Sequence, residues 1–429
     1  MQNHEETEYK KVFLVGVDTG EDENFTQSME ELESLAKACF MIPVGCITQI
    51  LPTANKALCL GSGKVIEVKE AAEEAEAEVV IFDNALSQVQ MRNLQKELGM
   101  SVMDRTGLIL DIFSYRAKTK EAKIQVEAAK LKYMLPRLVG MHEALSRQGG
   151  TSGNMSNKGA GEKKLELDRR RIEHRLAFLK KELEEVSKER HTQRKKRENS
   201  RIKNVALVGY TNAGKSTIMN GMVSLFIGEE NKKVLAKDML FATLETTVRH
   251  IESKDHKDFF LSDTVGFIHK LPHELVKAFR ATLEEAATAD LLLHVVDFSD
   301  SNYKQHMQVT NDTLAKLGAG DIPIVYVYNK SDLCCNRFPD DKADSIYMSA
   351  CNEEDIARLA EKIKKLLYGD FVTCRFLFPY DKGGAVSELI QNSEILEQEY
   401  VENGVHLVVN CHQRDASKYR EYAVVCEER

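Results

Sequence analysis

Three short segments carry residues suited to holding a nucleoside triphosphate, and the first is GYTNAGKS at positions 209–216. It fits the pattern GxxxxGK[ST], with a strand-like run before it and a helical stretch after it. Backbone N–H groups of such a loop surround the β-phosphate, and the following helix presents its positive end. In this pattern Lys215 reaches the β- and γ-phosphates and the Ser216 hydroxyl coordinates Mg²⁺. A chance glycine-rich turn is the alternative, which the flanking elements disfavour. We expect nucleotide contacts from Gly209, Tyr210, Thr211, Asn212, Ala213, Gly214, Lys215, Ser216 and Thr217.

The second segment is FFLSDTVGF (259–267), a strand that ends in Asp-x-x-Gly. Asp263 can hold Mg²⁺ through water, and the Gly266 amide can sense the γ-phosphate, so Thr264 and Val265 also belong to the predicted site. Alone, this pattern would indicate only a strand-end turn. Phe267 follows Gly266, where many GTPases place a glutamine that orients the attacking water. We therefore predict slow hydrolysis by the isolated chain.

The third segment is IVYVYNKSD (324–332), again a buried strand running into a loop. Asn329 can bond N7 or O6 of a base, and Lys330 can cover the ring beside Ser331. The Asp332 carboxylate can accept hydrogens from guanine N1 and N2, a donor pair that adenine lacks. Because unpaired buried polar groups are costly, such a site selects GTP over ATP. The later YMSA (347–350) suits a loop whose backbone contacts guanine O6, which adds Ser349, Ala350 and Cys351.

Alternating strand and helix patterns surround these segments. Strand-like runs at 11–17, 41–50 and 78–84 alternate with helical stretches near 28–39, 64–76 and 87–98, which predicts a small α/β domain with a largely parallel sheet. Residues 370–429 suggest a small α+β domain. We expect an α/β protein with four parts: an N-terminal α/β domain (1–106), a helical hairpin (107–200), a P-loop domain (201–368) and a C-terminal α+β domain (369–429).

The hairpin is predicted from two apolar seams of 4-3-4-3 spacing. The first seam runs from Ile124 to Leu138 and the second from Ile172 to Val186, and SRQGGTSGNMSNKGAGE (146–162) between them is predicted not to be helical. The tip is placed at about 141–162. Two unrelated amphipathic helices on a core are the alternative. Residues 116–201 hold 24 Lys and Arg against 12 Asp and Glu, although the whole chain has a net charge of −8. A basic module on an acidic protein indicates contact with a polyanion, first of all nucleic acid.

Composition excludes other classes of protein. The hydrophobic fraction is 43%, but no apolar run reaches the roughly 18 residues of a membrane span, and the polar N-terminus does not resemble a signal peptide. We therefore expect a cytoplasmic protein. The nine cysteines form no CxxC pair, so we expect reduced and mostly buried thiols rather than a zinc site or a disulfide framework.

Taken together, these segments resemble the HflX-type GTPases, ribosome-associated members of the translation-factor class of P-loop proteins. The resemblance rests on GYTNAGKST, LFATLETT, DTVGFIHKLPHELVKAFRATLEE (263–285), ADLLLHVVD (289–297), LGSGKV (60–65), MRNLQKEL (91–98), residues 104–140, LSRQGG (145–150) and LELDRRRI (165–172). Thr246 and Thr247 compete with Thr243 as a switch residue, but the resemblance favours Thr243 as the second hydroxyl ligand of Mg²⁺. Its neighbours Phe241, Ala242, Leu244 and Glu245 then adjoin the nucleotide.

The resemblance also implies a partner. The N-terminal domain would dock on the large (50S-type) ribosomal subunit, and the basic hairpin would reach its rRNA; DNA binding is not expected. Family members are associated with splitting stalled ribosomes, so we expect a GTPase with Lys215, Thr243 and Gly266 in catalytic roles and GTP or GDP with Mg²⁺ bound. A GTPase of RNA modification or ribosome assembly is the alternative. The family's N-terminal domain has been linked to ATP, but GSGK (61–64) lacks the full phosphate-loop spacing, and we interpret it as a strand-to-helix turn.

Overall fold

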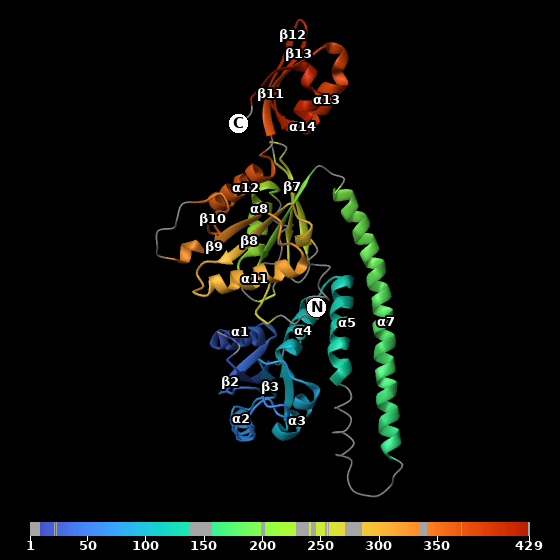
Figure 1. The fold of residues 1–429 in the computed structure, drawn as a ribbon, viewed down its shortest axis with the longest axis vertical. Coiled ribbons are helices and arrows are strands. Elements are labelled where there is room, and N and C mark those ends of the chain that lie inside the picture. Colours follow the sequence, from blue (N-terminus) through green and yellow to red (C-terminus); the bar gives the residue numbers. More distant parts are fainter. Residues whose placement is uncertain are drawn as a thin grey trace, which may run out of the picture. The chain divides into compact units, whose positions relative to one another are not determined.

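The structure, a computed structural model, divides into two compact units (Figure 1). It describes residues 9–20, 22, 24–137, 157–198, 202–228, 240–241, 246–253, 255, 257–270, 285–334, 341–369 and 371–427. Unit 1 comprises Met1–Lys195, Lys237–Glu245 and Val265–Leu283, and unit 2 comprises Lys196–Ala236, Thr246–Thr264 and Glu284–Arg429. Within the described residues, no helix is long and apolar enough to cross a lipid bilayer.

Unit 1 contains a four-stranded parallel sheet in the order β2-β1-β3-β4. Its elements are β1 (Lys10–Asp18), α1 (Phe25–Ala38), β2 (Met41–Ile50), α2 (Ser62–Glu74), β3 (Val79–Phe82), α3 (Gln88–Leu98), β4 (Ser101–Asp104) and α4 (Arg105–Arg116). The predicted parallel α/β domain is confirmed. Sequence analysis missed β4, because only two of its four residues, SVMD, are apolar, whereas all four residues of β3, VVIF, are apolar.

Local sequence explains where the helices of this domain begin and end. The Ser87 hydroxyl accepts a hydrogen bond from the Gln90 backbone N–H, and Gln90 Oε1 accepts one from the Ser87 backbone N–H, which forms a capping box at the start of α3. Gly99 ends α3 in the left-handed conformation. These two signals hold α3 on the apolar core under the sheet, to which it contributes Leu94 and Leu98.

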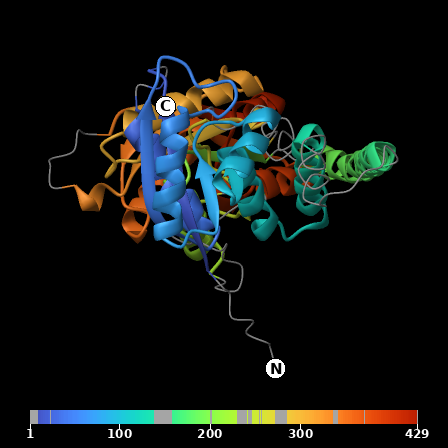
Figure 2. The same cartoon turned by 90° about the horizontal axis from the view of Figure 1, so that it is seen from below.

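Two further helices in unit 1, α5 (Lys120–Met134) and α7 (Asn157–Glu198), run side by side (Figures 1 and 2). A short 3₁₀ turn, η1 (Leu135–Arg137), follows α5. Their shared apolar contact contains Ile124, Ala128 and Leu131 of α5 with Leu176, Leu179 and Leu183 of α7. The Arg175 guanidinium pairs with the Glu127 carboxylate across the two helices at 2.7 Å.

The prediction that residues 146–162 contain no helix was wrong for the last part of the segment. Helix α7 already begins at Asn157 and passes through Gly159 and Gly161. A glycine inside a helix costs only about 1 kcal/mol, so a 42-residue helix can continue through two of them. The remainder of the predicted tip, from 141 to 156, lies outside the described residues.

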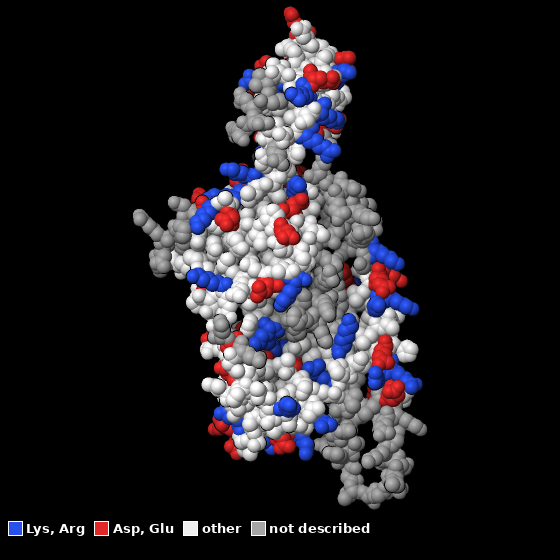
Figure 3. Space-filling view, in the orientation of Figure 1, with Lys and Arg blue, Asp and Glu red and all other residues white. Residues whose placement is uncertain are grey.

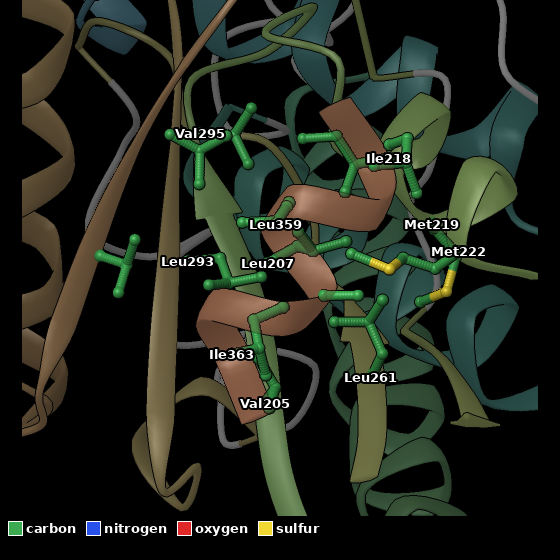
Figure 4. Packing of buried hydrophobic residues seen from close by; sticks show 14 of the residues in the cluster. Val205, Leu207, Ile218, Met219, Met222, Leu261, Leu293, Val295, Leu359 and Ile363 are labelled. Atoms are coloured by element: carbon green, nitrogen blue, oxygen red, sulfur yellow. The ribbon is translucent and has the colours of Figure 1, made fainter. Parts of the chain in front are cut away.

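Unit 2 contains a six-stranded sheet in the order β10-β9-β8-β5-β7-β6, in which only β6 is antiparallel. Its elements are β5 (Lys203–Gly209), α8 (Lys215–Phe226), β6 (Thr247–Ile251), β7 (Phe259–Asp263), β8 (Leu291–Asp297), α11 (Tyr303–Leu317), β9 (Ile324–Asn329), η3 (Ser331–Leu333), β10 (Ser345–Tyr347) and α12 (Glu353–Leu367). Figure 4 shows the core, where α12 packs Leu359 and Ile363 close to Leu207 and Val205 of β5. This core holds β5 and its neighbours rigid below the loops that follow them.

The C-terminal part of unit 2 is an antiparallel sheet in the order β12-β13-β11-β14, covered by α13 and α14. Its elements are β11 (Phe371–Phe378), η4 (Tyr380–Lys382), α13 (Gly383–Asn392), β12 (Glu394–Val401), β13 (Gly404–His412), α14 (Gln413–Lys418), η5 (Arg420–Tyr422) and β14 (Ala423–Glu427). The α+β prediction is confirmed, although β14 was missed. The prediction of reduced thiols was wrong at Cys374, which is disulfide-bonded and stands opposite Cys426 in the register of β11 and β14.

Candidate nucleotide-binding site

The loop between β5 and α8 adopts a conformation that glycine alone fits at two positions. Gly209 has φ +145°, and a Cβ there would lie 2.2 Å from the Val295 carbonyl oxygen. Gly214 has φ +98°, and its Cβ would lie 2.1 Å from Nδ2 of Asn329. Side chains are therefore excluded both by backbone conformation and by space. The glycines of the GxxxxGK pattern let the backbone turn tightly against β8 and β9.

Lys215 is the first residue of α8 and is buried. Its ammonium donates to the carbonyl oxygens of Gly209 at 3.0 Å and of Tyr210 at 2.6 Å. Burial lowers the pKa of Lys215 to about 8, while the charge of Asp263 acts in the opposite direction. Because these carbonyl groups are neutral, they do not cancel the positive charge of the ammonium, which can therefore attract an anion. This is the environment that a phosphate group requires.

Asp263 lies beside the start of α8. Its Oδ2 accepts a hydrogen bond from the Ser216 hydroxyl at 2.6 Å, and the residue is fully buried. The position follows from the parallel register of β5 and β7, which sets Asp263 against Leu207. The adjacent Thr264 hydroxyl donates to the Leu207 carbonyl at 2.7 Å and fastens the end of β7. A hydroxyl and a carboxylate oxygen next to a phosphate loop form a donor set that fits Mg²⁺.

Asn329, at the end of β9, connects two loops. Its Nδ2 donates to the Ala213 carbonyl at 2.8 Å, and its Oδ1 accepts from the Ala350 N–H at 2.8 Å. Sequence analysis assigned Asn329 to the base alone. The structure adds a structural role, because the buried amide ties the phosphate loop to the loop after β10.

The residues after Asn329 differ in their surroundings. Lys330 has φ +60°, and its ammonium pairs with Asp297 Oδ2 at 2.6 Å. Asp332 is exposed within η3, whereas Ser331 is buried and donates its N–H to the Met348 carbonyl at 3.2 Å. The carboxylate of Asp332 is thus accessible to a base, and the fold around it is held by backbone hydrogen bonds.

The loop after β10 uses its N–H groups within the protein. The Ser349 N–H donates to Asp355 Oδ2 at 2.8 Å, and the Ala350 N–H donates to Asn329. Cys351, next in the chain, is exposed. A base oxygen that contacts Ser349 or Ala350 would therefore share a hydrogen that already has an acceptor.

For several predicted site residues, the described part of the structure shows no contact with the phosphate loop. Ala242, Thr243, Leu244 and Glu245 lie outside the described residues. The ring of Phe241 is buried and packs edge-on against Phe113 of α4, with centroids 4.8 Å apart. Val265 and Phe267 are also buried, and Gly266 lies between them in unit 1. The Phe267 side chain is thus apolar and withdrawn from water.

Sequence analysis missed three polar residues near the site. Asp297, the partner of Lys330, ends the apolar strand β8, and an acidic residue at that position was a usable signal. His306 of α11 stacks on the Tyr210 ring of the loop at 3.9 Å between centroids. His294 of β8 is buried, and burial together with the charge of Lys215 lowers its pKa to about 4. Neither histidine occupies a position that a sequence pattern marks.

Comparison with known proteins agrees with this geometry. Three family models match in order: the GTP-binding GTPase N-terminal region at residues 26–114, the GTP-binding GTPase Middle Region at 116–197 and the 50S ribosome-binding GTPase at 204–330. GTPase HflX of Alkalihalophilus pseudofirmus is 44% identical over 96% of this chain and 96% of its own length. The chain belongs to the GTPase HflX family. It binds GTP and hydrolyses it.

Two further similarities place the chain among its relatives. GTPase HflX of Escherichia coli is 37% identical over 88% of this chain and 87% of its own length. A GTP-binding protein from Sulfolobus solfataricus, solved with GDP, is 24% identical with a TM-score of 0.44, and covers 83% of this chain and 98% of its own. The family assignment depends on the sequence relatives alone.

Proposed function

We propose that the loop from Gly209 to Thr217 holds the nucleotide phosphates, with Lys215 moving its hydrogen bonds from the loop carbonyls to the β- and γ-phosphates. The two glycines allow the backbone N–H groups to face the phosphates, and the buried ammonium supplies the charge that they attract. Asn329, Lys330, Ser331 and Asp332 receive guanine, aided by the loop from Ser349 to Cys351. The exposed carboxylate of Asp332 is the group that selects guanine.

Replacing Asp332 by asparagine tests the base site. The variant should lose roughly 100-fold in affinity for GDP, because an amide repels one of the two base donors, and it should prefer xanthosine diphosphate. Asp344→Asn is the matched control, since Asp344 is also exposed in a nearby loop. Calorimetric titration with both nucleotides measures the change. Unaltered preference would remove Asp332 from the site.

Magnesium is the ion that this proposal requires. Ser216 and Thr243 would supply hydroxyl ligands, and Asp263 would act through water. When bound, the ion would supply positive charge that neutralises the negative charge developing on the phosphates. The pairing of Ser216 with Asp263 supports a position for it next to α8. The Gly266 N–H would then contact the γ-phosphate, and Thr264 and Val265 keep that turn in place.

We further propose that hydrolysis is slow in the isolated chain and is accelerated by a partner. Phe267 occupies the position of a water-orienting side chain, but it is apolar and buried. A buried phenyl ring cannot orient water, so a polar group must come from elsewhere. In the isolated chain, Lys215, Thr243 and Gly266 would stabilise charge on the transferred phosphoryl group, but none of them would orient the attacking water.

The partner that we propose is the large ribosomal subunit. Residues 116–201 carry a surplus of twelve basic residues, the difference between 24 and 12. Arg169, Arg170 and Arg171 of α7 are exposed, and in the described part of the chain each pairs with a neighbouring acidic residue of the same helix. Exposed pairs of this kind are weak, so rRNA phosphates can replace the carboxylates. The family description "50S ribosome-binding GTPase" is in accord with this proposal.

In this proposal, a cytoplasmic nucleotide cycle splits or rescues stalled ribosomes. The GTP state would order the segments around Thr243 and Asp263 and favour the subunit-bound form, and hydrolysis would release it. A GTPase of RNA modification or ribosome assembly would also bind RNA. The two differ in their substrate: a splitting factor acts on assembled ribosomes, whereas an assembly factor acts on precursors.

Sedimentation through sucrose gradients tests the partner. With a non-hydrolysable GTP analogue the protein should travel with large subunits, and with GDP it should stay near the top. Addition of large subunits should also raise the GTPase rate at least tenfold, since the missing polar group is worth roughly 10²-fold. If neither sedimentation nor rate responds, the ribosomal proposal is wrong.

Charge variants locate the contact. Replacing Arg169, Arg170 and Arg171 together by alanine should weaken co-sedimentation and flatten its dependence on salt. The matched control is the triple variant Lys304→Ala, Lys316→Ala and Lys342→Ala, which removes three exposed charges from the GTPase domain, outside both the basic region and the N-terminal domain. Equal loss in both triple variants would indicate nonspecific charge attraction.

A further inference from the structure

The outer edge of the C-terminal sheet is the feature that neither the nucleotide site nor the basic helices account for. Strand β12 is at the end of the order β12-β13-β11-β14, so one of its sides carries unpaired backbone groups. An irregularity between Ile395 and Glu397 interrupts the pairing with β13. From 397 to 401 the register is regular. Five residues therefore form a straight edge that could accept another strand.

The side chains of β12 are exposed on both faces. The core of this part of the chain draws on β11, β13, α13 and α14, and includes no residue of β12. Leu396 is 49% exposed and Tyr400 is 72% exposed, although both are large hydrophobic residues. Uncovered apolar residues on a free edge are what soluble proteins generally avoid, unless a partner covers them.

The charged side chains of β12 and of the turn that follows it all have the same sign. Residues 383–413 contain five Glu and no Lys, Arg or Asp. Glu397 and Glu399 in the strand and Glu402 in the turn form no ion pair within the described part of the chain. Figure 3 shows carboxylates at the tip of this region. Soluble proteins often protect such edges with lysine, and here that protection is absent.

Alternation along the strand separates the two kinds of side chain. Because successive residues point to opposite faces, Glu397 and Glu399 share one face, and Gln398 and Tyr400 share the other. The hydrogen bond from Gln398 Nε2 to the Tyr400 hydroxyl, at 2.9 Å, agrees with this arrangement. The edge thus offers an acidic face and an aromatic face along one row of free backbone groups.

We propose that the 397–401 edge of β12 binds an extended, Lys- and Arg-bearing segment of a protein, which adds to the sheet as a further strand. The partner's cations meet Glu397 and Glu399, and an apolar side chain covers Tyr400. RNA is disfavoured, because its phosphates would face unpaired carboxylates. The identity of this partner as a protein of the large subunit rests on the proposed function, since proteins that bind rRNA are basic.

The two charged regions would then have different partners on the same particle. The helical region 116–201 has the surplus of positive charge that RNA attracts. The C-terminal edge has the negative charge that a basic protein segment attracts. The basic region would repel the basic protein segment, and the acidic edge would repel RNA. The bound chain would therefore have one orientation.

Photocrosslinking of the full-length chain tests this assignment. A benzoylphenylalanine is placed at Tyr400 and, in a second protein, at Phe178 of α7, which is 51% exposed. Both proteins are irradiated on purified large subunits with a non-hydrolysable GTP analogue, and the products are separated into protein and RNA. Crosslinks to a basic protein segment are expected at Tyr400, and crosslinks to rRNA at Phe178.

The outcomes separate the two proposals. Crosslinks from position 400 to RNA alone, or none there while position 178 reacts, would overturn the edge proposal and leave the ribosomal one standing. No crosslink from either position would count against both. A protein crosslink at 400 that maps to a segment without Lys or Arg would also overturn the charge argument.

A charge reversal provides the second arm. Glu397→Lys with Glu399→Lys should lower the protein crosslink at position 400 at least about tenfold, since close charge pairs are worth more than 1.4 kcal/mol. The crosslink at position 178 and the basal GTPase rate should not change. The matched control is Glu73→Lys with Glu74→Lys, an exposed acidic pair at the end of α2. Equal losses in both double variants would contradict a specific edge contact.

Discussion

The chain contains two glycine-lysine turns in two parallel α/β sheets, and only one has the geometry of a phosphate loop. Gly61 of the first turn has φ −67°, caps α2 and donates its N–H to Gln49 Oε1 at 3.0 Å. Gly209 and Gly214 of the second turn have strongly positive φ. GSGK (61–64) therefore leads into helix α2, as the interpretation as a strand-to-helix turn requires, although a loop at 51–60 separates it from strand β2. Glycine and lysine indicate a phosphate site only where the backbone needs the glycine.

The two sheets also differ in how the charged groups at their carboxyl ends are paired. In the N-terminal sheet, Arg105 pairs with Asp83 at 2.6 Å and with Glu31, and Lys270 pairs with Asp83 at 2.7 Å. Burial alone would raise the pKa of Asp83, but the charges of Arg105 and Lys270 hold it below its ordinary value. In the GTPase sheet, Lys215 is bonded by neutral carbonyls. In the N-terminal sheet the charged groups pair with one another. In the GTPase sheet the ammonium of Lys215 is bonded to neutral groups, which suits a site for an anionic ligand.

The largest difference between the two turns should appear when each lysine is removed. Lys215→Ala should lower GTP hydrolysis roughly 100-fold or more, because it removes a preorganised cation from the phosphates. Lys64→Ala should leave hydrolysis unchanged, since Lys64 is paired with the nearby Glu67. Steady-state phosphate release measures both. A comparable loss in Lys64→Ala would show that the first turn also serves the nucleotide.

Removal of the arginine from the N-terminal ion pairs should unfold that domain rather than affect chemistry. Arg105→Met should lower the free energy of unfolding by about 3–5 kcal/mol, because Asp83 keeps a buried charge with one partner fewer. Adding Asp83→Asn should recover part of the loss. Arg169→Met, which breaks an exposed pair with Glu173, should change little. Denaturant unfolding of the full chain gives these values, and a stable Arg105→Met protein would refute the comparison.

Glycine-to-alanine changes in the two turns should have opposite signs. Gly214→Ala should cost about 2 kcal/mol, since the left-handed conformation disfavours a side chain, and its Cβ would meet Asn329. Gly63→Ala should stabilise by about 0.5–1 kcal/mol, since alanine is the better helix former, and nothing lies within 4 Å of its Cβ. Thermal unfolding distinguishes them, and equal shifts would contradict the geometric distinction.

The smallest predicted effect concerns acid stability. The pKa of His294 in the folded chain, about 4, lies below its ordinary value of 6.5, so the unfolded chain binds more protons as the pH falls from 6.5 toward 4. Neutral His294 makes its full contribution to the free energy of unfolding above pH 6.5, and this contribution should fall by about 1 kcal/mol between pH 7 and 5.5. His294→Gln should lose that part of the pH slope. His174→Gln, at an exposed position of α7, should retain it.

Some elements were predictable because short-range patterns determine them. Strand β2 has the predicted bounds, 41–50, since it is a largely apolar run that ends in a loop. The predicted start of helix α7 was too late, because glycine propensity was given too much weight against the length of the helix. Strand β4 was missed because only two of its four residues are apolar, and β14 was missed as well.

The sequence alone indicated the chemistry that we propose for the nucleotide site: Gly209, Lys215, Asp263 and Asp332 are recognisable by type and spacing, because phosphates and a base would impose such residues locally. Only the tertiary structure decided how Asn329 joins Ala213 to Ala350, and why Arg105 is occupied by Asp83 and Glu31. These contacts join residues far apart in the chain. They depend on which strands lie next to each other, and no local pattern records that arrangement.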